Sequence, residues 1–174
     1  MAPPEIVLWT GPKHSGKTTA AAALADRARQ RGATVAGVLA ESVYRGGKLA
    51  GFDAVDLGTG HRAVLARRGR EGPVRVGEFT FDPKGLALGA EALSLGAAGD
   101  ADLVIVDEFG SLELSGQGWR EPVDALLASA RGIVLLVVRT RRLEAVRQLY
   151  AARNPRQVHA GDADAIEAVI AMLS

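Results

Sequence analysis

Cysteine is absent from the 174-residue chain, which excludes disulfide bonds, thiolate metal sites and thiol nucleophiles together. The absence also suits a reducing compartment. Neither charge is in excess, because 21 lysines and arginines balance 20 aspartates and glutamates and leave a formal net charge of +1. A chain with so little net charge is not attracted as a whole to nucleic acid or to an anionic membrane.

Long apolar runs are also missing. The runs at residues 103–106 and 133–138 are far shorter than the roughly 20 residues of a membrane-spanning helix. Residues 1–5 contain neither the basic nor the apolar segment of a secretory signal. The chain lacks a basic, aromatic-rich stretch, which argues against nucleic-acid binding. We therefore expect a soluble, cytoplasmic protein with neither a membrane nor a nucleic acid as partner, and no pattern indicates its oligomeric state.

Apolar runs alternate along the chain with segments of helical character. Runs that are apolar on both faces indicate buried strands, and their alternation with helices predicts an α/β fold, a mainly parallel sheet covered by helices. The expected strands are residues 6–10, 34–40, 101–106, 133–138 and 157–159. The expected helices are residues 17–31, 83–98, 122–131, 141–153 and 162–173, the last with Asp162 as its N-cap.

The segment from about residue 41 to residue 81 breaks this alternation. Two extended arms, 42–45 and 48–57, surround Gly46-Gly47 and predict a β-hairpin. Further strands are expected at 62–66 and 74–81. We interpret the segment as a β-hairpin-rich insertion within one domain that comprises residues 1–174.

A phosphate-binding loop is indicated between the first strand and the first helix. The chain there reads Gly11-Pro12-Lys13-His14-Ser15-Gly16-Lys17-Thr18, followed by Thr19, and matches G-x-x-x-x-G-K-[ST] in its proper strand–helix context. Backbone N–H groups of such a loop point at phosphate oxygens. Lys17 is expected to neutralise the β- and γ-phosphates, and Thr18 to place its hydroxyl on Mg²⁺. His14 occupies a variable position and is interpreted as incidental.

An acidic pair, Asp107 and Glu108, follows the apolar run at 103–106. The carboxyl end of a strand is where open α/β sheets bind ligands. Asp107 is therefore expected to hold Mg²⁺, and Glu108 to orient and deprotonate an attacking water.

An adjacent Asp-Glu pair is typical of the P-loop branch in which another strand separates the P-loop strand from the Asp strand. The run at 133–138 is the candidate for that strand, and its end would bring Arg139 or Thr140 near the γ-phosphate. An arginine there would stabilise transition-state charge, so Arg139 is a candidate catalytic residue.

In order along the chain, these motifs resemble the small thermophilic nucleoside triphosphatases and their cancer-related homologues. The resemblance covers residues 11–19, 37–41, the Gly46-Gly47 hairpin, 51–53, 65–67, 76–79 and 107–114. It implies a RecA-like P-loop fold and slow, Mg²⁺-dependent hydrolysis of ATP, GTP and other nucleoside triphosphates. It also implies the phosphate and metal roles for Lys17 and Thr18, and the metal and base roles for Asp107 and Glu108.

Several other residues are interpreted as structural. Glu41 and Asp53 are assigned to hairpin solubility, Arg67 to the surface, and Trp9 and Trp119 to packing. Two alternative functions remain. One is a small-molecule or nucleotide kinase, although no acceptor-binding motif is present. The other is a nucleotide-binding adaptor that uses slow hydrolysis as a switch.

Overall fold

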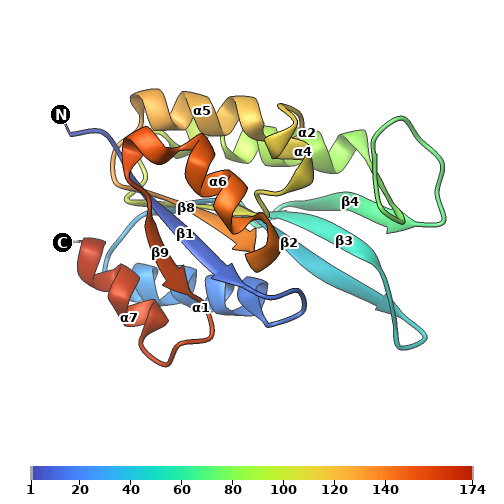
Figure 1. The fold of residues 1–174 in the computed structure, drawn as a ribbon, viewed down its shortest axis with the longest axis horizontal. Helices are drawn as coiled ribbons and strands as arrows, with labels where there is room; N and C mark the ends of the chain where they lie inside the picture. Colours follow the sequence, from blue (N-terminus) through green and yellow to red (C-terminus); the bar gives the residue numbers. More distant parts are fainter. Residues whose placement is uncertain (1, 174) are drawn as a thin grey trace.

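One mixed sheet forms the centre of the protein. The computed structural model describes residues 2–173, and its sheet has the strand order β5-β6-β4-β3-β2-β7-β8-β1-β9 (Figure 1). The strands are β1 (Glu5–Gly11), β2 (Val35–Arg45), β3 (Lys48–Asp56), β4 (Arg62–Arg68), β5 (Arg75–Val76), β6 (Phe79–Phe81), β7 (Leu103–Asp107), β8 (Ile133–Arg139) and β9 (Arg156–His159). The α-helices are α1 (Lys17–Gln30), α2 (Pro83–Ala92), α3 (Leu95–Ala98), α4 (Ser111–Leu114), α5 (Arg120–Ser129), α6 (Leu143–Leu149) and α7 (Ala165–Ile170).

The parallel half of the sheet comprises β2, β7, β8, β1 and β9. Strand β8 lies between β7 and β1, so the predicted strand between the P-loop strand and the Asp strand is confirmed. Both neighbours of β8 run parallel to it, which brings the carboxyl ends of β1, β7 and β8 to one edge. The α/β class predicted from the alternating pattern is confirmed.

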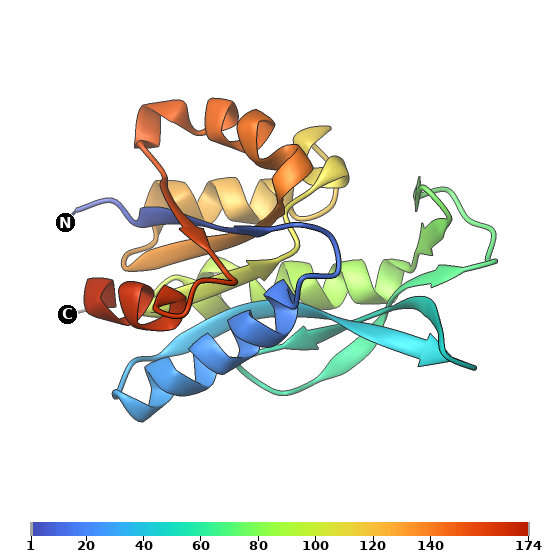
Figure 2. The same ribbon diagram turned by 60° about the horizontal axis from the view of Figure 1, so that its bottom comes forward.

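Helices cover both faces of this half (Figure 2). Successive side chains of a strand point to opposite faces. In β1, Val7 and Trp9 accordingly pack with α1 and α7, whereas Ile6 and Leu8 pack in the second core with α5 and α6. Because β1, β7 and β8 are apolar at almost every position, they are stable only between two helical layers.

The insertion is an antiparallel extension of the same sheet. Strand β2 starts in the parallel half and continues to Arg45 as the first arm of the predicted hairpin with β3. Strand β4 pairs with β3 and β6. The strand expected over 74–81 is instead a small hairpin, in which Val76 of β5 pairs with Phe79 of β6 around Gly77 and Glu78. The insertion projects from one end of the sheet (Figure 1).

The helices expected over 17–31 and 122–131 are α1 and α5 with bounds shifted by one or two residues, whereas the other three predicted helices are divided or shortened. The helix expected over 83–98 is divided into α2 and α3, because the Ser94 hydroxyl accepts a hydrogen bond from the Ala97 N–H and begins a new helix. The helix expected over 141–153 is α6 flanked by the 3₁₀ segments η1 (Thr140–Arg142) and η2 (Ala151–Arg153). A further 3₁₀ segment, η3 (Ala171–Leu173), follows α7.

Asp162 is not the N-cap predicted for the last helix. Helix α7 begins at Ala165, and the cap position is Asp164. The Asp162 carbonyl accepts a hydrogen bond from the Ala165 N–H, so this residue belongs to the turn before the helix. Within residues 2–173, no helix is both long and apolar enough to cross a membrane.

Candidate active site

The predicted phosphate-binding loop connects the end of β1 to the start of α1. Gly16 has the left-handed backbone conformation, with φ of 82°, and occupies the N-cap position of α1. A side chain there would be strained, because left-handed φ values are costly for residues with a Cβ. The Gly16 carbonyl accepts the first helical hydrogen bond, from Ala20 N–H at 2.9 Å. The loop therefore presents the N-terminus of a 14-residue helix to the edge of the sheet.

Lys17 lies in this loop with its ammonium group directed back across it. Its Nζ donates a hydrogen bond to the Pro12 carbonyl at 2.7 Å. The side chain is mostly buried, and burial lowers the pKa of Lys17, an effect that Arg139 reinforces and that Glu108 and Asp107 oppose. The ammonium group thus has one backbone acceptor and two nearby carboxylates.

Trp9 fixes the start of α1 against β1. Its indole is fully buried, and Nε1 donates a hydrogen bond to the Lys17 carbonyl at 3.2 Å. The predicted packing role of Trp9 is confirmed. Trp119 is likewise buried, and its Nε1 donates to the Leu86 carbonyl at 3.0 Å.

Asp107 ends strand β7 with its carboxylate buried beside Thr18. It accepts hydrogen bonds from the Ala40 N–H, at 3.2 Å, and from the Thr18 hydroxyl. Burial raises the pKa of Asp107 to about 7, although these hydrogen bonds and Lys17 act in the opposite direction. A carboxylate removed from water in this way is stabilised by an added positive charge.

Glu108 and Arg139 meet across the ends of β7 and β8. The Arg139 Nε donates to the Glu108 Oε2 at 3.0 Å, and both side chains are about 30% exposed, at 28% and 31%. Thr140, the other residue that the sequence placed near the γ-phosphate, is exposed and does not line the cavity described in the next paragraph.

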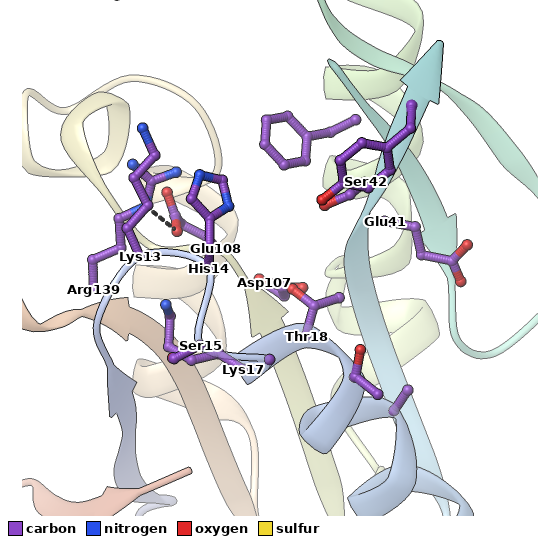
Figure 3. Close-up of a pocket in the computed structure, with 15 residues that line it drawn as sticks. Lys13, His14, Ser15, Lys17, Thr18, Glu41, Ser42, Asp107, Glu108 and Arg139 are labelled. Atoms are coloured by element: carbon purple, nitrogen blue, oxygen red, sulfur yellow. Dashed lines mark hydrogen bonds and ion pairs between the residues drawn. The ribbon is translucent and has the colours of Figure 1, made fainter. Parts of the chain in front are cut away.

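A cavity of about 530 Å³ lies between the loop and the insertion (Figure 3). Loop residues 13–19 form one wall with Asp107, Glu108 and Arg139. The other wall comes from β2 and β3 and comprises Glu41, Ser42, Tyr44 and Phe52. Lys13, His14 and Arg139 lie on one side of the cavity, and Glu41 and Ser42 lie across from them (Figure 3).

The residues of the far wall were not assigned to the site by the sequence. No motif marks Ser42 or Tyr44, and only the continuation of β2 past Ala40 brings them opposite the loop. Glu41 also forms an ion pair with Arg62. Two signals in the sequence pointed to this region: the glycine-paired hairpin, which indicated an extended arm, and the resemblance over residues 37–41 and 51–53, which include Glu41 and Phe52.

Arg67 is buried, so its assignment to the surface is wrong. Only 7% of it is exposed, and its Nη2 pairs with Asp53 Oδ1 at 2.6 Å. Its Nη1 donates to the Phe52 and Ala66 carbonyls at 2.7 and 2.9 Å. Arg67 and Asp53 hold β4 to β3, and neither lines the cavity.

Two oxygen-bearing side chains can hold a divalent cation. The Thr18 hydroxyl and the buried Asp107 carboxylate lie together in the cavity, and hard oxygen ligands suit Mg²⁺. Residues 2–173 contain no cluster of three or more histidine, aspartate or glutamate ligands. This donor set fits Mg²⁺, which is commonly held by one or two protein ligands together with substrate phosphates and water.

Comparison with known proteins identifies similar chains. The sequence profile of the family described as NTPase matches residues 6–166. The chain is 37% identical over 127 residues to the nucleoside-triphosphatase THEP1 of Methanopyrus kandleri, covering 73% of this chain and 68% of that protein. It is 32% identical over 129 residues to the THEP1 of Methanocaldococcus jannaschii, covering 74% and 75% of the two chains.

Two solved structures have the same fold. The human cancer-related nucleoside triphosphatase superposes with a TM-score of 0.73 at 25% identity, covering 98% of this chain and 95% of that one. THEP1 from Aquifex aeolicus superposes with a TM-score of 0.74 at 18% identity, covering 97% and 99% of the two chains. The second likeness concerns the fold alone.

Proposed function

Because the chain belongs to the NTPase family and is a nucleoside-triphosphatase, we propose that it hydrolyses ATP, GTP and other nucleoside triphosphates in the presence of Mg²⁺. The products are the diphosphate and inorganic phosphate. One observation carries the proposal: the residues predicted to bind phosphate, bind the metal, accept the proton and stabilise transition-state charge line a single cavity. These are Lys17, Thr18, Asp107, Glu108 and Arg139.

The loop and α1 bind the triphosphate. Backbone N–H groups of residues 13–19 and the positive end of the helix attract the phosphate oxygens. Lys17 leaves the Pro12 carbonyl and neutralises charge on the β- and γ-phosphates. Thr18 and Asp107 would hold the Mg²⁺ ion, which supplies charge neutralisation to the phosphates when bound.

Glu108 orients the attacking water and accepts its proton. The water oxygen forms a bond to the γ-phosphorus while the bond from that phosphorus to the bridging oxygen of the β-phosphate breaks. Arg139 donates to Glu108 through Nε, and its Nη groups are available for the charge that develops on the γ-phosphoryl oxygens.

Broad tolerance of the base is supported by the wall opposite the loop. Tyr44 and Phe52 supply aromatic surfaces there, and stacking on an aromatic ring does not distinguish one base from another.

Phosphate release from ATP, GTP, CTP and UTP, each with and without Mg²⁺, tests the proposal. We expect release with all four only when Mg²⁺ is present. Lys17→Ala should abolish it, Glu108→Gln should lower kcat by about 10²- to 10³-fold while nucleotide still binds, and Lys48→Ala, at the hairpin tip, serves as the control. Full release without Mg²⁺, or wild-type kcat in Glu108→Gln, would overturn the metal or base assignment.

A further inference from the structure

A second cavity, of about 400 Å³, adjoins the first at Asp107 and Glu108. It extends away from the loop towards α2, α4 and the β5–β6 hairpin. Its apolar lining includes Leu65, Phe81, Leu86 and Trp119. Hydrolysis needs room beside Glu108 for one water molecule only, which is far smaller than this cavity.

One aromatic ring is shared by the two cavities. Phe52 lines both of them, and its ring lies 5.4 Å from that of Phe79 in a tilted arrangement. The guanidinium group of Arg68 lies over the Phe79 ring, with its central carbon 5.1 Å from the ring centroid, and it forms an ion pair with Glu78. The β5–β6 hairpin therefore closes one side of the second cavity with the aromatic ring of Phe79.

Unpaired cations line the same cavity. Lys13, Arg141 and Arg142 all contribute to it, and within residues 2–173 none of the three forms an ion pair. The acidic side chains that face them are already engaged. Glu78 pairs with Arg68, and Glu108 pairs with Arg139.

Glu113 is held by the backbone, because it accepts hydrogen bonds from the N–H groups of Gly110 and Trp119 at 2.9 and 3.0 Å. Asp107 is buried against Thr18 and Ala40. Among residues 2–173, the charged side chains of this lining that form neither an ion pair nor a hydrogen bond are thus Lys13, Arg141 and Arg142, which favours an anionic ligand with an apolar body.

We propose that the second cavity binds a phosphoryl acceptor, a small molecule with a planar apolar body, an anionic group and a hydroxyl group. Glu108 lines both cavities, so a hydroxyl at the shared wall can take the place of the attacking water. The hydroxyl proton passes to Glu108 while the hydroxyl oxygen bonds to the γ-phosphorus. The bond from the γ-phosphorus to the bridging oxygen breaks, and the nucleoside diphosphate leaves. This inference rests on the proposed function, because the same loop and the same base are used.

Three naphthalene probes test the inference in the presence of [γ-³²P]ATP and Mg²⁺. The complete acceptor is 6-hydroxymethyl-2-naphthoate, 6-methyl-2-naphthoate lacks the hydroxyl, and 2-naphthalenemethanol lacks the anion. The first should acquire the label. The second should lower kcat for phosphate release without changing the KM for ATP, because it excludes water from Glu108. The third should bind at least tenfold more weakly than the first.

Variants assign the effect to the cavity. Combined Arg141→Gln and Arg142→Gln should weaken inhibition by 6-methyl-2-naphthoate at least tenfold, and Val76→Trp, at a half-exposed position of β5, should do the same by filling the space. Arg147→Gln, on α6 outside the cavity, is the matched control.

The outcomes separate this inference from the proposed function. If 6-hydroxymethyl-2-naphthoate stays unlabelled while phosphate release is normal, the inference is overturned and the proposed function stands. Inhibition by 6-methyl-2-naphthoate that raises the KM for ATP would overturn the inference as well, because the probe would then occupy the nucleotide cavity. Failure to release phosphate from ATP in the absence of any probe would instead contradict the proposed hydrolysis.

Discussion

Arg139 donates a hydrogen bond to Glu108 at 3.0 Å and so joins the ends of two neighbouring parallel strands, β8 and β7. The pairing follows from register. Asp107 lies opposite Val137, so Glu108, one residue beyond Asp107, and Arg139, two residues beyond Val137, emerge at the same edge of the sheet. The proposed base and the proposed transition-state cation therefore position each other.

Removing Arg139 is expected to impair catalysis more than binding. Arg139→Ala should lower kcat by about 10²- to 10³-fold with a small change in KM, because the guanidinium acts on charge that develops in the transition state. Arg139→Lys should recover only part of the loss, since an ammonium group lacks the planar fork. Steady-state kinetics measures both.

A double-mutant cycle tests the coupling of the pair. Losses in Arg139→Ala and Glu108→Gln should be far from additive in the double variant, because each residue acts partly through the other. Additive losses would mean that the two side chains act independently despite their contact.

Gly37→Ala should destabilise the protein strongly. Gly37 lies in β2 with φ of 122°, and an added Cβ would lie 2.0 Å from the Ile105 carbonyl oxygen in β7. We expect a loss of about 3 kcal/mol or more in the free energy of unfolding, measured by guanidinium denaturation. Gly46→Ala, at the open hairpin tip, should cost only about 1 kcal/mol. Equal losses in the two variants would exclude the close approach of β2 to β7 as the cause.

Arg67→Met should unfold more readily than the wild type because it leaves Asp53 without its partner. The pair is largely buried, and breaking one side of a buried ion pair costs about 3 kcal/mol. Replacing both residues, as Arg67→Met with Asp53→Leu, should restore much of this stability. Arg62→Met, which breaks an exposed pair with Glu41, should cost less than about 1 kcal/mol. A comparable loss in Arg62→Met would contradict the role of burial.

Asp102 should contribute to stability in a pH-dependent manner. Its Oδ2 accepts hydrogen bonds from the Thr34 N–H and hydroxyl at 2.8 and 2.9 Å, and these bonds lower the pKa of Asp102 below its usual 3.8. A carboxyl group whose pKa is lower in the folded than in the unfolded state stabilises the folded state at pH values above the unfolded-state pKa. That contribution disappears as the pH falls through the lowered pKa.

Asp102→Asn should therefore lower the free energy of unfolding by about 1 kcal/mol at pH 7, and the difference should shrink as the pH falls below 3.8. Urea denaturation at pH 7 and across the acid range measures this. Asp100→Asn, whose side chain is 99% exposed, is the control and should leave the free energy of unfolding at pH 7 close to that of the wild type. A deficit in Asp102→Asn that is the same at pH 7 and pH 2 would rule out the ionised carboxyl as its source.

Local patterns determined much of this protein. The glycine–lysine–threonine spacing placed the loop between β1 and α1, and the apolar runs placed the buried strands that carry Asp107 and Arg139. Such features depend on residues close together in the chain, where backbone conformation and side-chain periodicity are fixed by neighbouring positions. The strand between β1 and β7 was also predicted correctly, but from the P-loop branch that the Asp-Glu pair indicates.

The tertiary structure alone decided the far wall, the second cavity and the burial of Arg67. Each depends on the insertion, whose strands turn back on one another through hairpins and a shift of register near Val43. A one-residue shift reverses which face every side chain occupies, and no local pattern specifies it. The opposition of Tyr44 and Phe52 to the loop, and of Val76 to Leu86, therefore exists only once the antiparallel strands have paired with the parallel sheet.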